Sequence, residues 1–316
     1  MAITLNWSNR NTGVTNFKVY RGTSPTNLAL LTTLANTATS YVDSSASNNV
    51  LYYYRINAVL SASDEIPGTV TPFCAITDTG PGPQVLARGN MEFGYFGTLN
   101  VSDFVSSADM QAAFPAGTAY TTSITTWYKM ACNGKVLFIP NNPVRQTTQA
   151  PVSTLNALYN AGAMLGTGEA TVPHATTTAG STPVVQNKKV VFGSYEFYAR
   201  LPKAQQTGDI RTNVFMTTAI VRETSFSEAS MISSLTVGWV AVASAIAQGL
   251  APAQLHAGTS SLISNFSPVL TQHGNASSAV VSLTIGNGIN QCLGATLSGS
   301  STTHYVFGIL ELIPTS

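Results

Sequence analysis

Residues 51–59, Leu-Tyr-Tyr-Tyr-Arg-Ile-Asn-Ala-Val, decide how the first part of this 316-residue chain folds. Aromatic and β-branched residues dominate the run, and these residue types favour pleated, half-buried strands. Apolar residues also alternate with polar ones over 3–7 and 17–21, and a period of two is typical of strands with one buried face. Polar turns separate the candidate strands at 9–13, 22–27 and 43–49. Short strands at this regular spacing predict a small β-sandwich over residues 1–75.

The same runs carry a family resemblance. Its motifs are Leu5-Asn6-Trp7, Phe17-Lys18-Val19-Tyr20-Arg21, Tyr41-Val42-Asp43 and Tyr52-x-Tyr54-Arg55-Ile56-x-Ala58-Val59. Their spacing resembles that of a fibronectin type III domain, an immunoglobulin-like sandwich. The resemblance implies that Trp7 fills the core from the second strand of the family. It also implies that the hydroxyl of Tyr52 bonds back to the main chain at a corner.

The family's first strand has no counterpart here, because almost nothing precedes Leu5. Without that strand, the main-chain N–H and C=O groups of residues 3–7 would form an unpaired edge, which proteins usually cover. We therefore expect another chain, or the second part of this chain, to supply a strand at this edge.

A linker is expected at residues 76–84, which include Gly80-Pro81-Gly82-Pro83. This pattern cannot continue a central strand or a helix. It predicts a boundary between the domain at 1–75 and a second domain at 85–316.

The second domain has mixed patterns. Helices are expected over 101–114, capped by Ser102 or Asp103, and over 151–164. Asn133-Gly134 lies between two apolar runs and predicts a type I′ hairpin turn. The polar, small-residue stretch 166–186 is expected to be an exposed loop. Further strands are expected at 190–201, 214–221, 235–242, 280–285 and 305–312.

A second resemblance covers this domain. Its motifs are Arg88-Gly89-x-Met91-x-x-Gly94-Tyr95-Phe96-Gly97-Thr98, Trp127-x-Lys129, Asn133-Gly134-Lys135-x-Leu137-Phe138-Ile139-Pro140-x-x-Pro143-Val144-Arg145, Leu158-x-x-Ala161-Gly162, Tyr198-x-Arg200-Leu201 and Phe307-Gly308-Ile309-Leu310-Glu311-Leu312. They resemble a module of tailed-bacteriophage virion and tail-fibre proteins, with a C-type-lectin-like or formylglycine-generating-enzyme-like fold. The family's closing Trp-Arg-Pro is replaced around Phe307-Gly308-Ile309, and residues 205–300 lack its Trp-rich segment. The resemblance implies a β-rich α+β module.

The composition excludes several classes of partner. Charged residues make up only 9% of the chain, the net charge is +1, and 41 Thr and 32 Ser supply much of the polarity. No basic field exists to attract nucleic acid or an anionic membrane. A protein with so few charges risks self-association when it diffuses freely. We therefore expect a permanent member of an assembly, with a Ser/Thr-rich secreted β-protein as the alternative.

Targeting and redox signals are sparse. The first residues show neither a basic nor an apolar signal-peptide region, and the apolar run at 237–250 is too short to cross a membrane. Cys74, Cys132 and Cys292 are isolated, without zinc spacing. We expect buried free thiols in a chain made in the reducing cytoplasm of a host bacterium.

The sequence offers no pattern for catalysis, metal binding or cofactor binding. The histidines stand alone, at His174, His256, His273 and His304. The chain lacks G-x-S-x-G and the phosphate-binding G-x-x-x-x-G-K-[ST], and Asp64-Glu65 is its sole adjacent acidic pair. We therefore predict a protein that is not an enzyme and has no catalytic, cofactor or metal-binding residues. Resemblance to trimeric phage fibres leaves His273 or His304 as a minor candidate for an axial metal ligand.

Aromatic residues are the remaining candidates for ligand contacts. Phe93, Tyr95 and Phe96, and the run Tyr52–Tyr54, could stack on saccharides, although alternating aromatic residues more often pack in a core. Tyr53 should face away from the sandwich core and is the best candidate for a partner contact.

Together these patterns predict a structural component of a bacteriophage virion. The expected place is the tail, as a fibre, baseplate or collar protein in a homo-oligomer, with a trimer favoured by family analogy. Its partners would be other virion proteins, and a host surface glycan could be a further one. The alternatives are a capsid decoration protein or head fibre, and a lectin-like receptor-binding protein.

Overall fold

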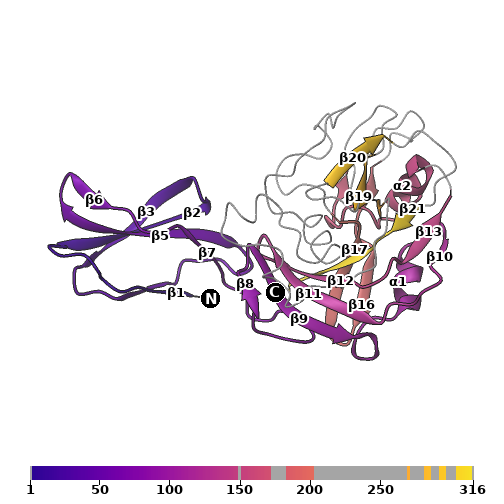
Figure 1. Ribbon diagram of the computed structural model, residues 1–316, viewed down its shortest axis with the longest axis horizontal. Coiled ribbons are helices and arrows are strands. Elements are labelled where there is room, and N and C mark those ends of the chain that lie inside the picture. The colour runs from indigo at the N-terminus through magenta and orange to yellow at the C-terminus, as the bar shows by residue number, and fades with distance from the viewer. Residues whose placement is uncertain are drawn as a thin grey trace. The chain divides into compact units, whose positions relative to one another are not determined.

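The computed structural model describes residues 2–148, 151–171, 183–202, 269–270, 281–285, 292–296 and 304–314 (Figure 1). The chain forms two compact units. Unit 1 comprises Met1–Thr79 together with the short segments Asn90–Phe93 and Asn133–Lys135, and unit 2 comprises the rest. Strands far outnumber helices in the described residues, so the predicted mainly β class is confirmed.

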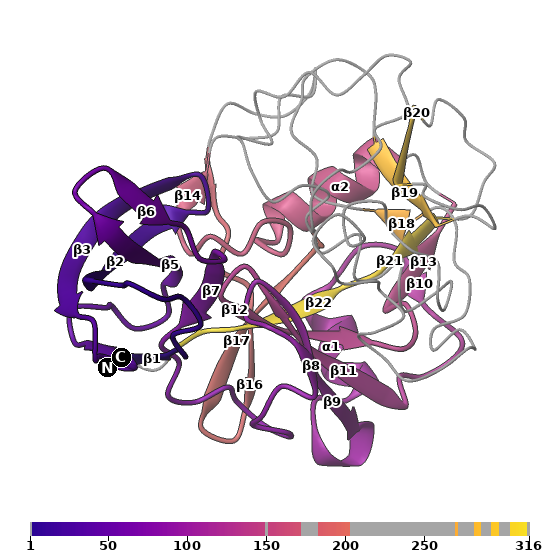
Figure 2. The same cartoon turned by 60° about the vertical axis from the view of Figure 1, so that its left-hand side comes forward.

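Unit 1 is built from two sheets. Its strands are β1 (Ile3–Asn6), β2 (Asn16–Ser24), β3 (Asn27–Ala35), β4 (Ser40–Asp43), β5 (Leu51–Ser61), β6 (Asp64–Ile66) and β7 (Thr71–Cys74). The larger sheet has the order β3-β2-β5, and both β6 and β7 pair with β5. The smaller sheet is the antiparallel pair β1-β4. Figures 1 and 2 show β1 across from β2, β3 and β5.

A shared core joins the two sheets, as in a β-sandwich. Leu5 from the small sheet packs in one cluster with Val19 and Tyr54 from the large one. Trp7 packs edge-on against Phe17, with ring centroids 5.5 Å apart. The core contact expected of Trp7 is therefore present. Alternation of buried and exposed residues along β1 follows from the period of two in the sequence.

The corner bond expected of Tyr52 is also present. The main-chain N–H of Ser47 donates to the Tyr52 hydroxyl oxygen at 3.4 Å. Beside it, the Arg21 guanidinium lies 4.8 Å from the centroid of the Tyr52 ring.

A seven-stranded sheet forms the centre of unit 2. In order across the sheet, its strands are β16 (Lys189–Phe192), β17 (Tyr195–Arg200), β22 (Ile309–Leu312), β12 (Lys135–Pro140), β11 (Thr126–Cys132), β9 (Phe93–Asn100) and β8 (Arg88–Gly89). The late strand β22 lies between β17 and β12, and all four of its residues are buried.

Two further sheets complete the described part of unit 2. One has the order β10 (Thr118–Ala119), β13 (Arg145–Thr147), β21 (His304–Val306), β18 (Val269–Leu270), β19 (Val281–Ile285) and β20 (Cys292–Thr296). The other is the pair β14 (Ala170–Thr171) and β15 (Val184–Val185). These two short strands lie within the stretch 166–186 that was expected to be a loop. The strands expected at 214–221 and 235–242 lie outside the described residues.

The turn prediction was confirmed and the first helix prediction was partly wrong. Asn133 and Gly134 join β11 to β12 with φ of 50° and 77°, as a type I′ turn requires. Residues 101–114 contain a 3-10 turn, η1 (Val101–Asp103), and a separate helix, α1 (Ser107–Ala113). The cap of α1 is Ser106, because its side chain and that of Asp109 form a reciprocal capping box. The second helix, α2 (Pro151–Asn160), ends before the expected Met164.

The Gly-Pro stretch of the expected linker belongs partly to unit 2. The fully buried Lys129 ammonium donates to the carbonyls of Gly80, Pro81 and Pro83, at 3.1, 2.9 and 2.7 Å. Proline has no N–H and cannot join a ladder fully, so the carbonyls of this segment need another donor. Lys129 of β11 is that donor. The boundary between unit 1 and unit 2 lies after Thr79.

We predict that Lys129→Met destabilises unit 2 by about 1–3 kcal/mol or more, because it removes the donor of three carbonyls. Protease cleavage within residues 79–89 should become faster. Chemical denaturation and limited proteolysis of the full chain would measure both effects. Lys189→Met is the matched control, because Lys189 forms an exposed ion pair with Glu196 and its loss should change little. If both variants had the same free energy of unfolding and the same cleavage rate, the role of Lys129 would be contradicted.

Candidate interaction surface

The open edge of β1 is the feature of unit 1 best suited to bind another molecule. In the described part of the chain, β1 pairs with β4 alone. The Trp7 N–H donates to the Thr39 carbonyl at 2.9 Å, so odd-numbered residues form the hydrogen-bonded pairs with β4. Hydrogen bonding alternates along an antiparallel strand. The N–H and C=O groups of Thr4 and Asn6 therefore point away from β4.

A groove of about 300 Å³ lies beside this edge. The residues that line it are Leu5, Asn6, Trp7, Ser8, Asn9, Asn11, Phe17, Tyr54, Ile56, Ala58, Ile66, Pro67, Gly68, Thr69, Thr71 and Phe73. They come from β1 and the turn after it, from the inner face of β2 and β5, and from the β6–β7 segment. No residue of β4 lines the groove, so the groove lies on the side of β1 that faces away from β4.

The groove has an apolar floor and an uncharged polar rim. Leu5, Phe17 and Tyr54 of the floor are all at most 3% exposed. The rim includes the exposed Asn6 and Thr71. None of the sixteen lining residues is charged. An opening onto a sandwich core, beside unpaired main-chain groups, can accept an extended segment.

Trp7, which lines the groove, carries an unpartnered polar atom behind it. Its indole N–H is buried and has no hydrogen-bond acceptor among the described residues. A buried donor left without an acceptor costs about 1–3 kcal/mol. Because this N–H has almost no solvent-accessible area, it does not face the open volume of the groove.

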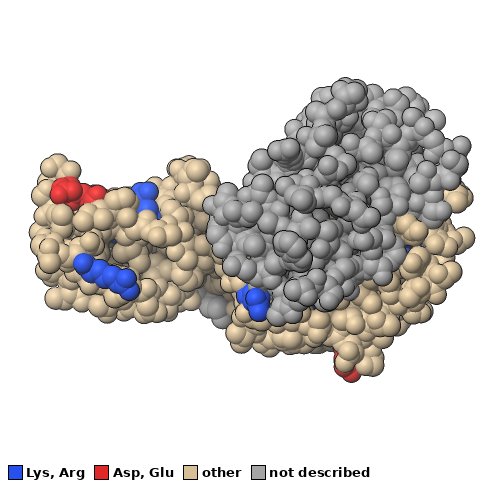
Figure 3. Space-filling model, in the orientation of Figure 1, with Lys and Arg blue, Asp and Glu red and all other residues tan. Residues whose placement is uncertain are grey.

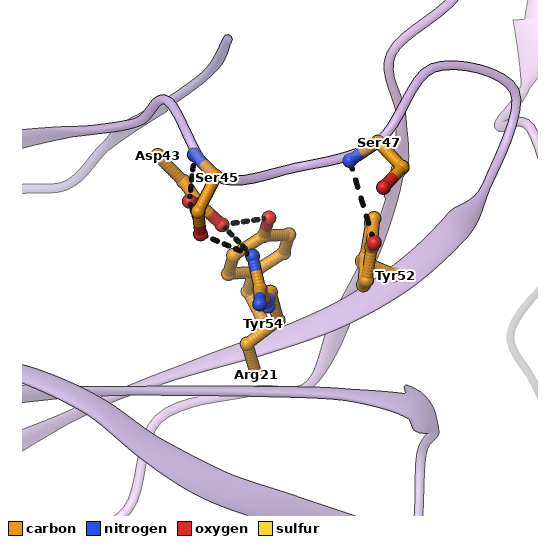
Figure 4. Close-up of polar contacts among 6 residues, drawn as sticks. All are labelled: Arg21, Asp43, Ser45, Ser47, Tyr52 and Tyr54. Atoms are coloured by element: carbon orange, nitrogen blue, oxygen red, sulfur yellow. Dashed lines mark hydrogen bonds and ion pairs between the residues drawn. The ribbon is translucent and has the colours of Figure 1, made fainter.

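A buried carboxylate, that of Asp43, connects β4 to the large sheet (Figure 4). Asp43, at the end of β4, accepts hydrogen bonds from Tyr54 and Arg21, both at 2.7 Å. The N–H and hydroxyl of Ser45 donate to its other oxygen at 3.0 and 2.7 Å. The side chain of Asp43 is only 1% exposed. These bonds connect the small sheet to β2 and β5. Among the described residues, β4 and β1 each pair with one strand only.

These contacts change the proton affinities of the groups involved. Burial raises the pKa of Asp43, but the hydrogen bonds from Tyr54, Ser45 and Arg21 outweigh burial and hold its pKa below the ordinary 3.8. Burial, together with the bond to Asp43, raises the pKa of the Tyr54 hydroxyl. Asp43 is therefore a structural anion at neutral pH and Tyr54 a neutral donor.

A second polar cluster lies on the large sheet. Glu65 accepts hydrogen bonds from Lys18, Tyr20 and Asn57, the latter two at 3.0 Å. The bond from Lys18, followed by that from Asn57, lowers the pKa of Glu65 to about 2. Each member of the cluster has a partner, so the cluster is an ion pair that reinforces β2, β5 and β6. Glu65 belongs to the adjacent acidic pair that the sequence showed, and here it stabilises strands.

The structure revises two aromatic candidates. Tyr53 lies on the opposite face of β5 from the core, as expected, but it is only 7% exposed. Its hydroxyl donates to Glu92 of the segment Asn90–Phe93 at 2.8 Å. The prediction of a free partner contact at Tyr53 is therefore wrong, because another segment of unit 1 covers it. Phe93 and Phe96 are also buried, at 1% and 4% exposure, and Tyr95 is half-buried.

Histidines and cysteines give no cluster in the described residues. His174, His256 and His273 lie outside them, and His304 lies in β21. No group of three or more potential metal ligands occurs among the residues that were placed. Cys74 and Cys132 are free thiols, and burial raises the pKa of Cys74 to about 11. Cys292 lies in β20.

The surface carries even less charge than the composition suggests. Of the 14 Lys and Arg and 13 Asp and Glu in the chain, Asp43, Lys129, Arg200 and Glu311 are buried. Figure 3 accordingly shows few blue or red atoms on the described parts of its face. Among the described helices, none has the length and apolar character needed to cross a bilayer.

The chain was compared with protein-family models and with curated protein sequences. Neither comparison gives a match.

We predict that unit 1 loses stability as the pH falls through the lowered pKa of Asp43. The folded pKa lies below the unfolded value of 3.8, so the stabilisation is complete above about pH 4 and is lost below it. Asp43→Asn should lower stability at pH 7 by about 1–3 kcal/mol and flatten this pH dependence. Amide hydrogen exchange of residues 2–75, measured as a function of pH, would report both the stability at pH 7 and its pH dependence. Asp64→Asn, at an exposed position, should leave the profile unchanged; the same flattening there would contradict the assignment.

Proposed function

We propose that the protein is a non-enzymatic structural component of a bacteriophage virion, placed in the tail as a fibre, baseplate or collar protein. The observation that carries the proposal is the uncharged groove beside the unpaired edge of β1. An open edge is an aggregation hazard for a freely diffusing protein, whereas in an assembly a neighbouring chain covers it. The resemblance of residues 1–75 to a fibronectin type III domain, and of the second domain to tail-fibre modules, supplies the virion context.

The scarcity of surface charge supports the same proposal. Surface charge keeps separate protein molecules apart, and this chain has little of it. A permanent neighbour removes that requirement, because much of the surface is then covered. Assembly into a homo-oligomer, with a trimer favoured, and docking on other virion proteins are the roles that we propose.

A lectin-like role receives less support from the described residues. Saccharide-stacking aromatic side chains must be exposed. Of the candidates, Phe93, Phe96, Tyr53 and Tyr54 are buried, and Tyr52 and Tyr95 are half-buried. A head-decoration role uses the same kind of open-edged sandwich, so it is the second outcome that the test must separate from the first.

The test is immunogold electron microscopy of particles purified from lysed cultures that produce the chain, with antibody raised against the full chain. We expect gold at the tail. Gold over the head would instead support a decoration protein. Particles without label, with the chain present in the lysate on a blot, would contradict the virion proposal.

A further inference from the structure

Resting on the proposed function, we infer that the groove beside β1 is a binding site for one extended, uncharged segment of a different polypeptide chain. The segment adds to β1 as a strand and places alternate apolar side chains on the groove floor. The main-chain groups of Thr4 and Asn6 supply the hydrogen bonds, because they point away from β4 and have no partner strand among the described residues.

The geometry of a strand matches the groove. Side chains two residues apart on a strand point to the same face, about 6.6–6.8 Å from each other. A strand paired with Thr4 and Asn6 would therefore direct every second side chain between β1 and β7, onto Leu5, Phe17 and Tyr54. The groove volume of about 300 Å³ is at the lower end of ordinary ligand sites. It has room for a few apolar side chains but not for a folded element.

The chemistry of the lining defines the occupant. None of the lining residues is charged, so a Lys, Arg, Asp or Glu on the inward face of the segment would lose its hydration without gaining a partner. The occupant is therefore a segment with uncharged, alternately apolar residues, held by main-chain bonds.

β1 is a short strand of four residues, but it carries no charged residue, proline or bulge that would prevent pairing at its edge. Its sequence, Ile3-Thr4-Leu5-Asn6, contains no Lys and no Pro, and its pairing with β4 shows no bulge. Natural edge strands carry such features to prevent pairing. The absence of these features from β1 fits an edge that pairs with another strand.

A second copy of this chain fits the groove less well. The β1 strand of a second copy already packs Ile3 and Leu5 into its own core. It could pair edge to edge with β1, but its apolar side chains would remain in its own sandwich. The groove would then stay empty, so a separate extended segment is the better occupant.

The test measures amide exchange by NMR on the ¹⁵N-labelled full chain, with a synthetic peptide as probe. The probe is blocked Thr-Val-Thr-Val-Thr-Val-Thr, and the control peptide has proline in place of the central valine, which prevents ladder pairing. We expect the valine peptide at saturation to slow exchange of the Thr4 and Asn6 amides about tenfold or more. The proline peptide should leave their exchange unchanged.

Matched variants tie the effect to the groove. Thr71→Lys puts a charge on the rim, and the slowing should be lost. Thr23→Lys makes the same change at an exposed position of β2 that does not line the groove, and the slowing should remain. In both variants the Leu5 and Trp7 amides, which bond to β4, report whether the sandwich is folded.

Three results would overturn the inference. One is failure of the valine peptide to slow Thr4 and Asn6 in a chain with protected Leu5 and Trp7. Another is protection of both edge amides in the monomeric chain alone, which would mean that the chain covers its own edge. The third is protection that appears only as the chain dimerises, which would assign the edge to a second copy. None of these results depends on the location of the protein in a particle, so the virion proposal can fail separately.

Discussion

Main-chain N–H and C=O groups that leave water need partners, and this constraint governs the arrangement of both units. Where a ladder cannot satisfy them, a single side chain does so, as Lys129 does for the carbonyls of Gly80, Pro81 and Pro83. Charged side chains that are buried obey the same constraint. Arg200 bonds to Glu311 at 2.7 Å and to the carbonyl of Leu201 at 3.0 Å, which joins β17 to the late strand β22. The outer edge of β1 has no partner strand among the described residues.

Local signals in the sequence predicted local structure well. Alternation predicted β1 and β2, and the aromatic and β-branched run predicted β5, whereas β6 and β7 were not predicted. Asn133-Gly134 predicted the turn, because a type I′ turn requires positive φ at two adjacent residues. The start of α1 could have been predicted correctly from the sequence. Ser106 and Asp109 have the spacing of a capping box, while Phe104 and Val105 are buried in unit 2 before the helix begins. The capping signal at Ser106 and Asp109 marks the start of α1 more closely than the apolar pattern does.

Contacts between distant segments could not be predicted in this way. Tyr53 is on the expected face of β5, yet its exposure depends on a segment about forty residues later, which brings Glu92 to its hydroxyl. The pairing of Arg200 with Glu311 spans 111 positions, and no periodicity connects them. The groove beside β1 was not predictable, since its lining comes from three separate parts of unit 1.

The chemistry of the groove also bears on the kind of association it supports. A neutral groove on a surface with few charges has no field to steer a partner, so association should proceed at the ordinary, unsteered rate of about 10⁵–10⁶ M⁻¹s⁻¹ and respond little to salt. Affinity must then come from slow dissociation, through main-chain bonds and burial of apolar side chains. Such contacts suit neighbours that assemble once and remain together better than partners that exchange rapidly. The paired anion at Asp43 fits this view, because it fixes the small sheet to β2 and β5.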